Sequence, residues 1–265
     1  MPGLPMNCGP MIERSGDCTE DAFLGGQLRL RQPKSGHRAG HDAMLLAAAT
    51  SAHPGDRVLD FGAGVGVAGL AVAKRVAGIE IILVEIDPDL CDLARENSLA
   101  NGVQTKVVVL DIASGAQAFA DAGLPPDSAD VVLMNPPFND PARHRVSPDR
   151  GRQIAHMAKA ATLESWIHAA RRILKSGGAL TLIWRADALA EILAALLRGF
   201  GSLRILPVHG DPTAPAIRVL VRAIKGGGAP LALDPGLLLN HAPNVPNPQV
   251  QEILAGRETL PWARL

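Results

Sequence analysis

Residues 57–66 read RVLDFGAGVG: a short apolar run followed by glycine at positions 62, 64 and 66. The run has the length of a buried strand, and alternate glycines permit a tight turn into the helical pattern that begins at Val67. A turn of this kind brings backbone amides to a helix N-terminus, within reach of a ligand. The stretch therefore predicts a ligand-binding strand–turn–helix that opens an α/β domain.

Four further apolar runs follow at residues 80–86, 106–110, 129–135 and 178–184, and segments with helical periodicity separate them. Strands that are apolar on both faces and alternate with helices are typical of a parallel sheet covered on both sides.

The last two runs, residues 203–210 and 216–224, are joined by a loop too short for a crossover helix. They should pair antiparallel and place a reversed strand at one edge of the sheet. Seven strands ending in this way are typical of the α/β, Rossmann-like class I methyltransferase fold, with helices on both faces. The nicotinamide-binding sheet normally stays parallel throughout.

Around this core, at residues 56–225, we expect two extensions. Residues 1–55 should form a flexible lead-in, a hairpin about Gly25-Gly26 and a helix from His41 or Asp42, with Asp42 able to cap its first turn. Residues 226–265 are rich in Gly, Pro and Asn, and should form an appendage packed on the domain, with a short helix at 248–255.

The composition excludes several classes of protein. The 265 residues carry 26 basic and 26 acidic side chains, so the formal net charge is zero and a broadly basic coat is absent. The three cysteines show no metal-ligand or disulfide spacing, and the eight histidines complete no metal site. With neither a signal peptide nor an apolar run long enough for a membrane span, we expect a cytoplasmic protein without a metal.

Three acids end successive strands: Asp60, Glu85 and Asp111. Because the carboxyl ends of parallel strands form one crevice, their carboxylates should share a site. Residues 64–69 also match the dinucleotide fingerprint G-x-G-x-x-G. However, a carboxylate at Asp60 is poorly placed beside a pyrophosphate and well placed for the ammonium of a methionine moiety.

The other two acids suit a nucleoside. Glu85 can accept both ribose hydroxyls while Ile86 packs on the adenine ring, and Asp111 with the Ile112 amide can bind the adenine edge. The alternative for Asp111 is a cap on the next helix, and for Asp87, before Pro88, helix capping is favoured.

The tetrapeptide Asn135-Pro136-Pro137-Phe138 ends the fourth strand of the domain. An exocyclic amine on a base, or an amide nitrogen, is a poor nucleophile because its lone pair is delocalised. The Asn135 side-chain oxygen and the Pro136 carbonyl could accept its two N–H groups and orient it for methyl transfer. Phe138 offers a face for stacking on a planar base.

These motifs resemble those of amino-directed class I methyltransferases. Together with residues 21–33 (DAFLGGQLRLRQP), 38–49 (RAGHDAMLLAAA) and 216–233, they resemble the tRNA1(Val) adenine-N6 methyltransferase family. The resemblance implies that Asn135, Pro136 and Phe138 hold the target adenine. The residues expected to bind S-adenosylmethionine are Arg38, His41, Asp60, Gly62, Ala63, Gly64, Gly66, Glu85, Ile86, Asp111, Ile112 and Asn135. His41 departs from the family, in which a small hydroxyl residue is common at this position.

Basic side chains gather in two segments, residues 27–41 and 141–175. Arg29 and Arg31 in the first, and Arg143 and Arg145 in the second, could hold RNA phosphates, although a merely solvated face explains them as well.

The leading hypothesis is therefore S-adenosylmethionine-dependent methylation of adenine N6 in a tRNA, near the anticodon. Methylation of a protein glutamine amide or of guanine N2 in ribosomal RNA remains open. A noncatalytic module that binds the cofactor or RNA is a further alternative.

Overall fold

The computed structural model describes residues 18–34, 38, 40–137, 150–242 and 245–264, with side chains in the 150–173 helix described from residue 162. The seven expected strands are all present in one sheet. They are β3 (Arg57–Phe61), β4 (Glu80–Glu85), β5 (Thr105–Val109), β6 (Ala129–Met134), β7 (Leu174–Arg185), β8 (Phe200–His209) and β9 (Ala216–Lys225). Their order is β8-β9-β7-β6-β3-β4-β5, and β9 alone runs in the direction opposite to the other six.

The reversed strand differs from expectation in its place. β9 lies between β7 and β8 rather than at the edge. The chain leaves β7 through a 3-10 turn, η3 (Ala186–Ala188), and the helix α6 (Leu189–Leu196). This crossover leaves room for one strand between β7 and β8, and β9 occupies that position. In the described part of the chain, two short strands, β10 (Ala232–Leu233) and β11 (Leu237–Leu238), extend the sheet to nine by pairing parallel with β8.

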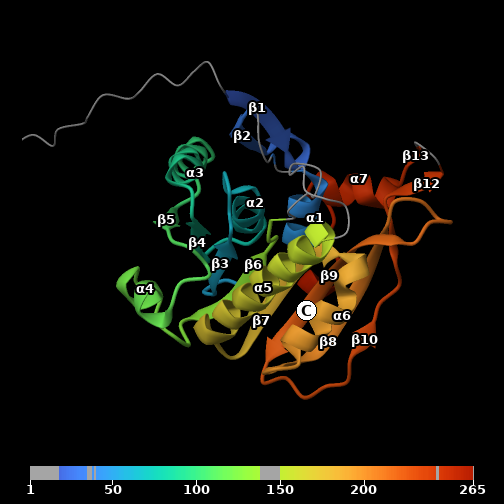
Figure 1. Ribbon diagram of the computed structural model, residues 1–265. Helices are drawn as coiled ribbons and strands as arrows, with labels where there is room; N and C mark the ends of the chain where they lie inside the picture. Colours follow the sequence, from blue (N-terminus) through green and yellow to red (C-terminus); the bar gives the residue numbers. More distant parts are fainter. Residues whose placement is uncertain (1–17, 35–37, 39, 138–149, 243–244, 265) are drawn as a thin grey trace, which may run out of the picture.

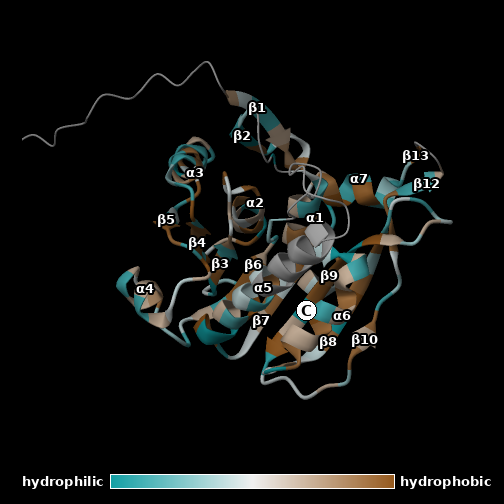
Figure 2. Ribbon diagram, in the orientation of Figure 1, coloured by the Kyte–Doolittle hydropathy of each residue, from teal (hydrophilic) through white to brown (hydrophobic). Residues whose placement is uncertain are grey.

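Helices cover both faces of the sheet (Figure 1). One layer holds α1 (His41–Ala49), α2 (Val67–Arg75) and α3 (Pro88–Ala100), and the other holds α4 (Ala116–Asp121), α5 (Arg150–Ile173) and α6. Successive strand residues enter opposite cores, since side chains alternate across a sheet: Leu83 packs under α2, and Val84 packs with Phe61 and Phe119 on the other side. The apolar strands between the more hydrophilic outer helix surfaces are visible in Figure 2.

The N-terminal hairpin forms as expected. It pairs β1 (Cys18–Phe23) with β2 (Leu28–Pro33) through a 3-10 turn, η1 (Leu24–Gly26). The expectation for Asp42 is wrong: Gly40 is the N-cap of α1 and no side chain caps it. Asp42 instead accepts a hydrogen bond from Nε of Arg218 at 2.9 Å, which ties the start of α1 to β9. Asp87 caps α3 as expected, accepting the amide of Asp89 at 2.8 Å.

The C-terminal segment contains a small pair of strands, β12 (Asn240–Ala242) and β13 (Val245–Pro246), then α7 (Pro248–Leu254) and a 3-10 turn, η4 (Pro261–Arg264). Trp262 is fully buried in the same core as α1 and α2. Its indole N–H donates to Asp234 at 2.9 Å, and Asp234 also pairs with Arg204 of β8. The segment therefore completes a core that the sheet and α1 begin.

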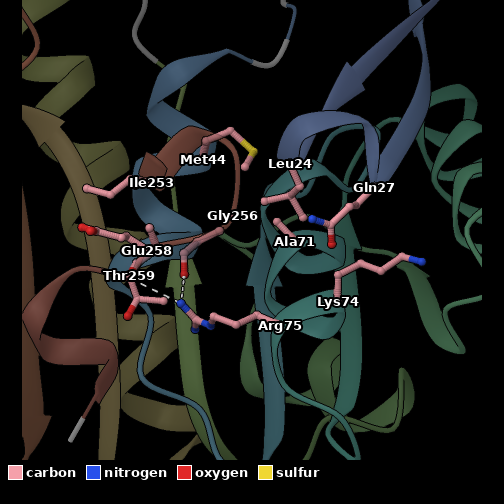
Figure 3. A pocket seen from close by; sticks show the side chains of 12 residues that line it. Leu24, Gln27, Met44, Ala71, Lys74, Arg75, Ile253, Gly256, Glu258 and Thr259 are labelled. Atoms are coloured by element: carbon pink, nitrogen blue, oxygen red, sulfur yellow. Dashed lines mark hydrogen bonds between the residues drawn. The ribbon is translucent and has the colours of Figure 1, made fainter. Parts of the chain in front are cut away.

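Arg75 joins α2 to the end of α1, at the meeting point of the hairpin, both helices and the C-terminal segment (Figure 3). Its guanidinium donates to the carbonyl of Ala47 at 2.9 Å and also to that of Thr50, so it provides a charged donor to carbonyls at the end of the helix. Burial lowers the pKa of Arg75 to about 10. The cavity at this junction is only about 60 Å³, too small for a nucleoside.

Within the described residues, no helix is both long and apolar enough to cross a membrane.

Candidate functional site

A cavity of about 670 Å³ opens at the carboxyl ends of β3, β4 and β6, the edge at which open α/β sheets bind ligands. Its volume is within the usual range for cofactor sites. The expected site residues that line it are Arg38, His41, Asp60, Gly62, Ala63, Gly64, Glu85, Ile86, Asp111, Ile112 and Asn135. Residues from five parts of the chain thus share one cavity.

Asp60 lies at the floor of this cavity, with an exposed fraction of 2%. One carboxylate oxygen accepts the amide N–H of Gly69 at 2.8 Å. Burial raises the pKa of Asp60 to about 7; the charge of Glu85 adds to the rise and the Gly69 hydrogen bond opposes it. A cation bound beside Asp60 would relieve this cost, which suits an ammonium group.

Glu85 is also buried, and its carboxylate organises the turn around it. It accepts the amide of Gly64 at 2.8 Å through one oxygen, and the amides of Ile86 and Asp87 at 2.8 and 3.0 Å through the other. An ionised carboxylate offers two acceptor sites on each oxygen, so the oxygen that accepts only the Gly64 amide retains capacity for a ribose hydroxyl.

The glycine turn uses its amides differently from the expectation. The N–H groups of Gly62 and Ala63 both donate to the carbonyl of Val84, at 2.8 and 3.0 Å, and that of Gly64 donates to Glu85. Gly66 does not line the cavity: a Cβ there would face Leu83 and Leu70 in the core. The amides of the turn are therefore already bonded within the protein. Its glycines shape one wall of the cavity and do not offer a row of free donors to a ligand.

Trp166 and Arg218 are among the cavity residues that the sequence reasoning missed. Trp166 of α5 packs against Gly62, and Arg218 of β9 reaches the cavity from two strands beyond Asn135. Trp166 carried one signal, since the chain has only three Trp and no Tyr. Arg218 carried none, because its place depends on β9 inserting next to β7.

Asp111 and the two isoleucines occupy the end of the cavity near β4 and β5. Asp111 accepts the amide of Ala113 at 2.8 Å, whereas the N-cap of α4 is Gly115, without a side-chain cap. The alternative in which Asp111 caps that helix is thus wrong. Ile112 is buried, while Ile86 lines the cavity with 59% of its surface exposed.

Asn135 lies just after β6, and its side-chain oxygen is buried without a hydrogen-bond partner among the described residues. A buried, unpaired acceptor costs about 1–3 kcal/mol. Pro137 lines the cavity beside it and Pro136 is buried behind. Phe138 lies outside the described residues.

The residues expected to bind RNA divide into two groups. Arg29 pairs with Glu20 at 3.2 Å and Arg31 with Glu96 at 2.7 Å, so the charges of both are locally balanced. Arg143 and Arg145 lie outside the described residues. Among the side chains that the structure describes, no group of three or more His, Cys, Asp or Glu is arranged to hold a metal ion.

Residues 38–209, which include every described cavity residue except Gln32 and Arg218, match the family model of the methyltransferase small domain. The chain belongs to this methyltransferase family. A tRNA1(Val) (adenine(37)-N6)-methyltransferase of Porphyromonas gingivalis is 30% identical to this methyltransferase over 207 residues, which are 76% of this chain and 79% of the relative. Its counterpart in Dyadobacter fermentans is 29% identical over 197 residues, 74% and 79% of the two chains. The resemblance inferred from the motifs is confirmed.

Solved structures agree on the fold. A protein of Agrobacterium tumefaciens described as a predicted O-methyltransferase superposes on this methyltransferase with a TM-score of 0.68 and 33% identity, covering 83% of this chain and 98% of its own. TrmN from Thermus thermophilus has a TM-score of 0.51 at 21% identity, over 70% of this chain and 48% of its own. The second similarity shows the fold alone.

Proposed function

We propose that this methyltransferase transfers the methyl group of S-adenosylmethionine to N6 of an adenine in tRNA, near the anticodon. The relatives described as tRNA1(Val) (adenine(37)-N6)-methyltransferases support the substrate. The observation that carries the chemistry is the buried side-chain oxygen of Asn135, which has no partner in the described part of the chain and shares the cavity with Asp60 and Glu85.

The cavity fits the cofactor on this chain's own geometry. Its volume accommodates a nucleoside with an amino-acid tail, and Asp60 provides a buried carboxylate for an ammonium group. Glu85 faces the same cavity for ribose hydroxyls, and Ile86 and Ile112 line its apolar end for adenine. When bound, S-adenosylmethionine supplies an electrophilic methyl on its sulfonium.

The chain's contribution to transfer is orientation and polarisation. Asn135 accepts one N–H of the exocyclic amine, and the Pro136 carbonyl accepts the other. This draws electron density toward nitrogen and directs its lone pair at the methyl group. Arg38, His41 and Asp42 line the cavity on the side of the α1 N-terminus, which supports a role for them at the methionine end of the cofactor.

The test is incubation with methyl-labelled S-adenosylmethionine and three acceptors: unmodified tRNA, ribosomal RNA and cell protein. Label recovered as N6-methyladenosine from the tRNA is the expected result. Label recovered as N2-methylguanosine or in glutamine would support the other amino acceptors. Label on a hydroxyl would instead agree with the description of the Agrobacterium structure.

The catalytic assignment is tested by Asn135→Ala. This change should lower the rate of methyl transfer by about 100-fold or more, and leave the affinity for S-adenosylhomocysteine within a few-fold of wild type. Gln117→Ala, in an exposed side chain of α4 that pairs with Asp121, is the matched control and should behave as wild type. Full activity in the Asn135 variant would refute the assignment.

A further inference from the structure

Asn97 is a polar side chain of α3 with an exposed fraction of only 1%, and none of the roles assigned above involves it. Its amide nitrogen donates to the carbonyl of Val65 at 3.0 Å and to that of Arg31 at 3.1 Å. Its amide oxygen accepts the N–H of Arg31 at 2.8 Å. Two donors and one acceptor on a short side chain are what a primary amide provides, so this environment selects asparagine.

The three bonds connect two walls of the cofactor cavity. Val65 belongs to the glycine turn and lines the cavity on that side. Arg31 lies in β2 immediately before Gln32, which lines the cavity from the hairpin. Gln32 in turn donates to Asp21 at 3.0 Å, and Asp21 pairs with Arg38. A single amide thus fixes the turn relative to the hairpin.

Other contacts also hold the turn, but they come from a different element than the contact made by Asn97. The amides of Gly62 and Ala63 are fixed by β4, and that of Gly64 by Glu85. These contacts come from the strand beneath the turn. The contact at Val65 comes from α3. Because the same Asn97 side chain also binds Arg31 of β2, it couples the position of the turn to that of the hairpin.

Asn101, one helical turn further along α3, provides an internal comparison. Its oxygen accepts the N–H of Arg29 at 3.0 Å, and its nitrogen donates to the Arg29 carbonyl at 2.7 Å. It therefore grips the same strand in the same manner. Its remaining bond, at 2.8 Å, goes to the carbonyl of Asn97 in its own helix instead of to the glycine turn.

We propose that Asn97 is a positioning residue that sets the affinity for the cofactor by holding the glycine turn and the N-terminal hairpin at a fixed separation. The proposal rests on the assignment of the cavity to S-adenosylmethionine. Asn97 acts through Val65 and Gln32, so its loss should loosen both walls together. The reacting groups at Asn135 are held by β6 and stay in place.

The experiment compares Asn97→Ala with Asn101→Ala by calorimetric titration of S-adenosylhomocysteine, thermal unfolding and steady-state kinetics. Each variant removes one of the two asparagine contacts that hold β2 on α3, so their midpoints of unfolding should fall by similar amounts. Asn97→Ala should weaken binding and raise KM for S-adenosylmethionine about tenfold, with kcat at saturation within about threefold of wild type. Asn101→Ala should change affinity by less than about twofold. Equal effects of the two changes on affinity, or a fall in kcat without a change in affinity, would overturn the proposal.

Hydrogen exchange on the wild-type chain gives a second readout that needs no variant. S-adenosylhomocysteine should slow exchange of the Arg31 amide, which Asn97 holds, as well as that of the turn. Unchanged exchange at Arg31 in the bound state would also overturn the proposal. Failure to methylate tRNA with normal binding of S-adenosylhomocysteine would count against the proposed function alone, whereas a wild-type chain unable to bind it would overturn both.

Discussion

The indole of Trp166 lies against the backbone of Gly62, so close that a Cβ on Gly62 would stand 2.4 Å from Cη2 of the ring. The contact joins the last third of α5 to the turn after β3, two segments about a hundred residues apart in the sequence. It forms one side of the cavity, because both residues line it. The glycine turn is thus supported by a helix that follows the Asn-Pro-Pro-Phe tetrapeptide.

Gly62→Ala should destabilise the protein more than Gly64→Ala does. The backbone at Gly62 has φ +68°, which costs an L residue about 1–2 kcal/mol, and overpacking against Trp166 adds about 1–3 kcal/mol. Gly64→Ala is the control, since Gly64 has φ +57° but open space where a Cβ would stand. Chemical denaturation should show the greater loss of stability in the Gly62 variant. Equal losses would mean that the backbone, and not the indole, sets the requirement.

The stability of the protein should depend on pH through Asp60. Its pKa is about 7 in the folded chain and near 3.8 when exposed, so the folded state holds an extra proton between these values. The contribution of Asp60 to stability therefore falls as pH rises from about 4 to 7. Asp60→Asn should stabilise the apo protein at pH 8 and have little effect at pH 4, as measured by thermal unfolding. A stabilisation that is equal at both values would contradict the assignment.

Binding should show the opposite dependence on pH. If the ionised form of Asp60 holds the ammonium of the cofactor, affinity for S-adenosylhomocysteine rises as pH increases through about 7. Calorimetry from pH 5.5 to 8 on wild type and Asp60→Asn checks this, because the variant should bind weakly and without that pH dependence. Wild-type affinity that is flat over the range would exclude a contact with the ionised carboxylate.

The C-terminal segment should be required for stability. Trp262→Ala removes a fully buried indole and leaves a cavity next to α1, at a cost of about 3–5 kcal/mol. Trp262→Phe keeps most of the volume but loses the hydrogen bond to Asp234, and should cost less. Urea unfolding distinguishes the two. A loss below about 1 kcal/mol in the alanine variant would show that the segment packs only loosely.

Arg29 and Arg31 should contribute little to RNA binding. Each is paired with a glutamate, so substitution to alanine removes a charge that is already offset. Affinity for tRNA should change by less than about twofold, and the dependence on salt should be unaltered. Glu96→Gln frees Arg31 and serves as the converse test. A tenfold loss of affinity for tRNA with Arg31→Ala, measured at two salt concentrations, would contradict this prediction and support Arg31 as a phosphate contact.

The sequence predicted those parts of the site that follow from the order of parallel strands. Asp60, Glu85 and Asn135 each end a strand, and strands that run in one direction end at one edge, so their convergence on a cavity was expected. The bonding of the glycine-turn amides was not expected. The partner of Gly62 and Ala63 is a backbone carbonyl, and backbone contacts of this kind cannot be read from residue types.

The remaining differences come from contacts distant in sequence. Whether β9 pairs outside β8 or enters beside β7 depends on how far α6 carries the chain, and a hydrophobic pattern does not measure that distance. Arg218 reaches the cavity only because β9 enters beside β7. Asn97 looks like an ordinary helix residue until the hairpin is placed on α3, and Asp42 follows a capping pattern but is drawn to Arg218 instead.

The two short strands beside β8 also affect how the protein behaves among other molecules. An outer strand with open N–H and C=O groups is a template for association with a second chain. Here β10 pairs with Arg204 and Ile205, and β11 with Val208 and His209. A protein shortened before Ala232 would lose Trp262 and also present the full length of β8 to its neighbours, and we expect aggregation to accompany the loss of stability.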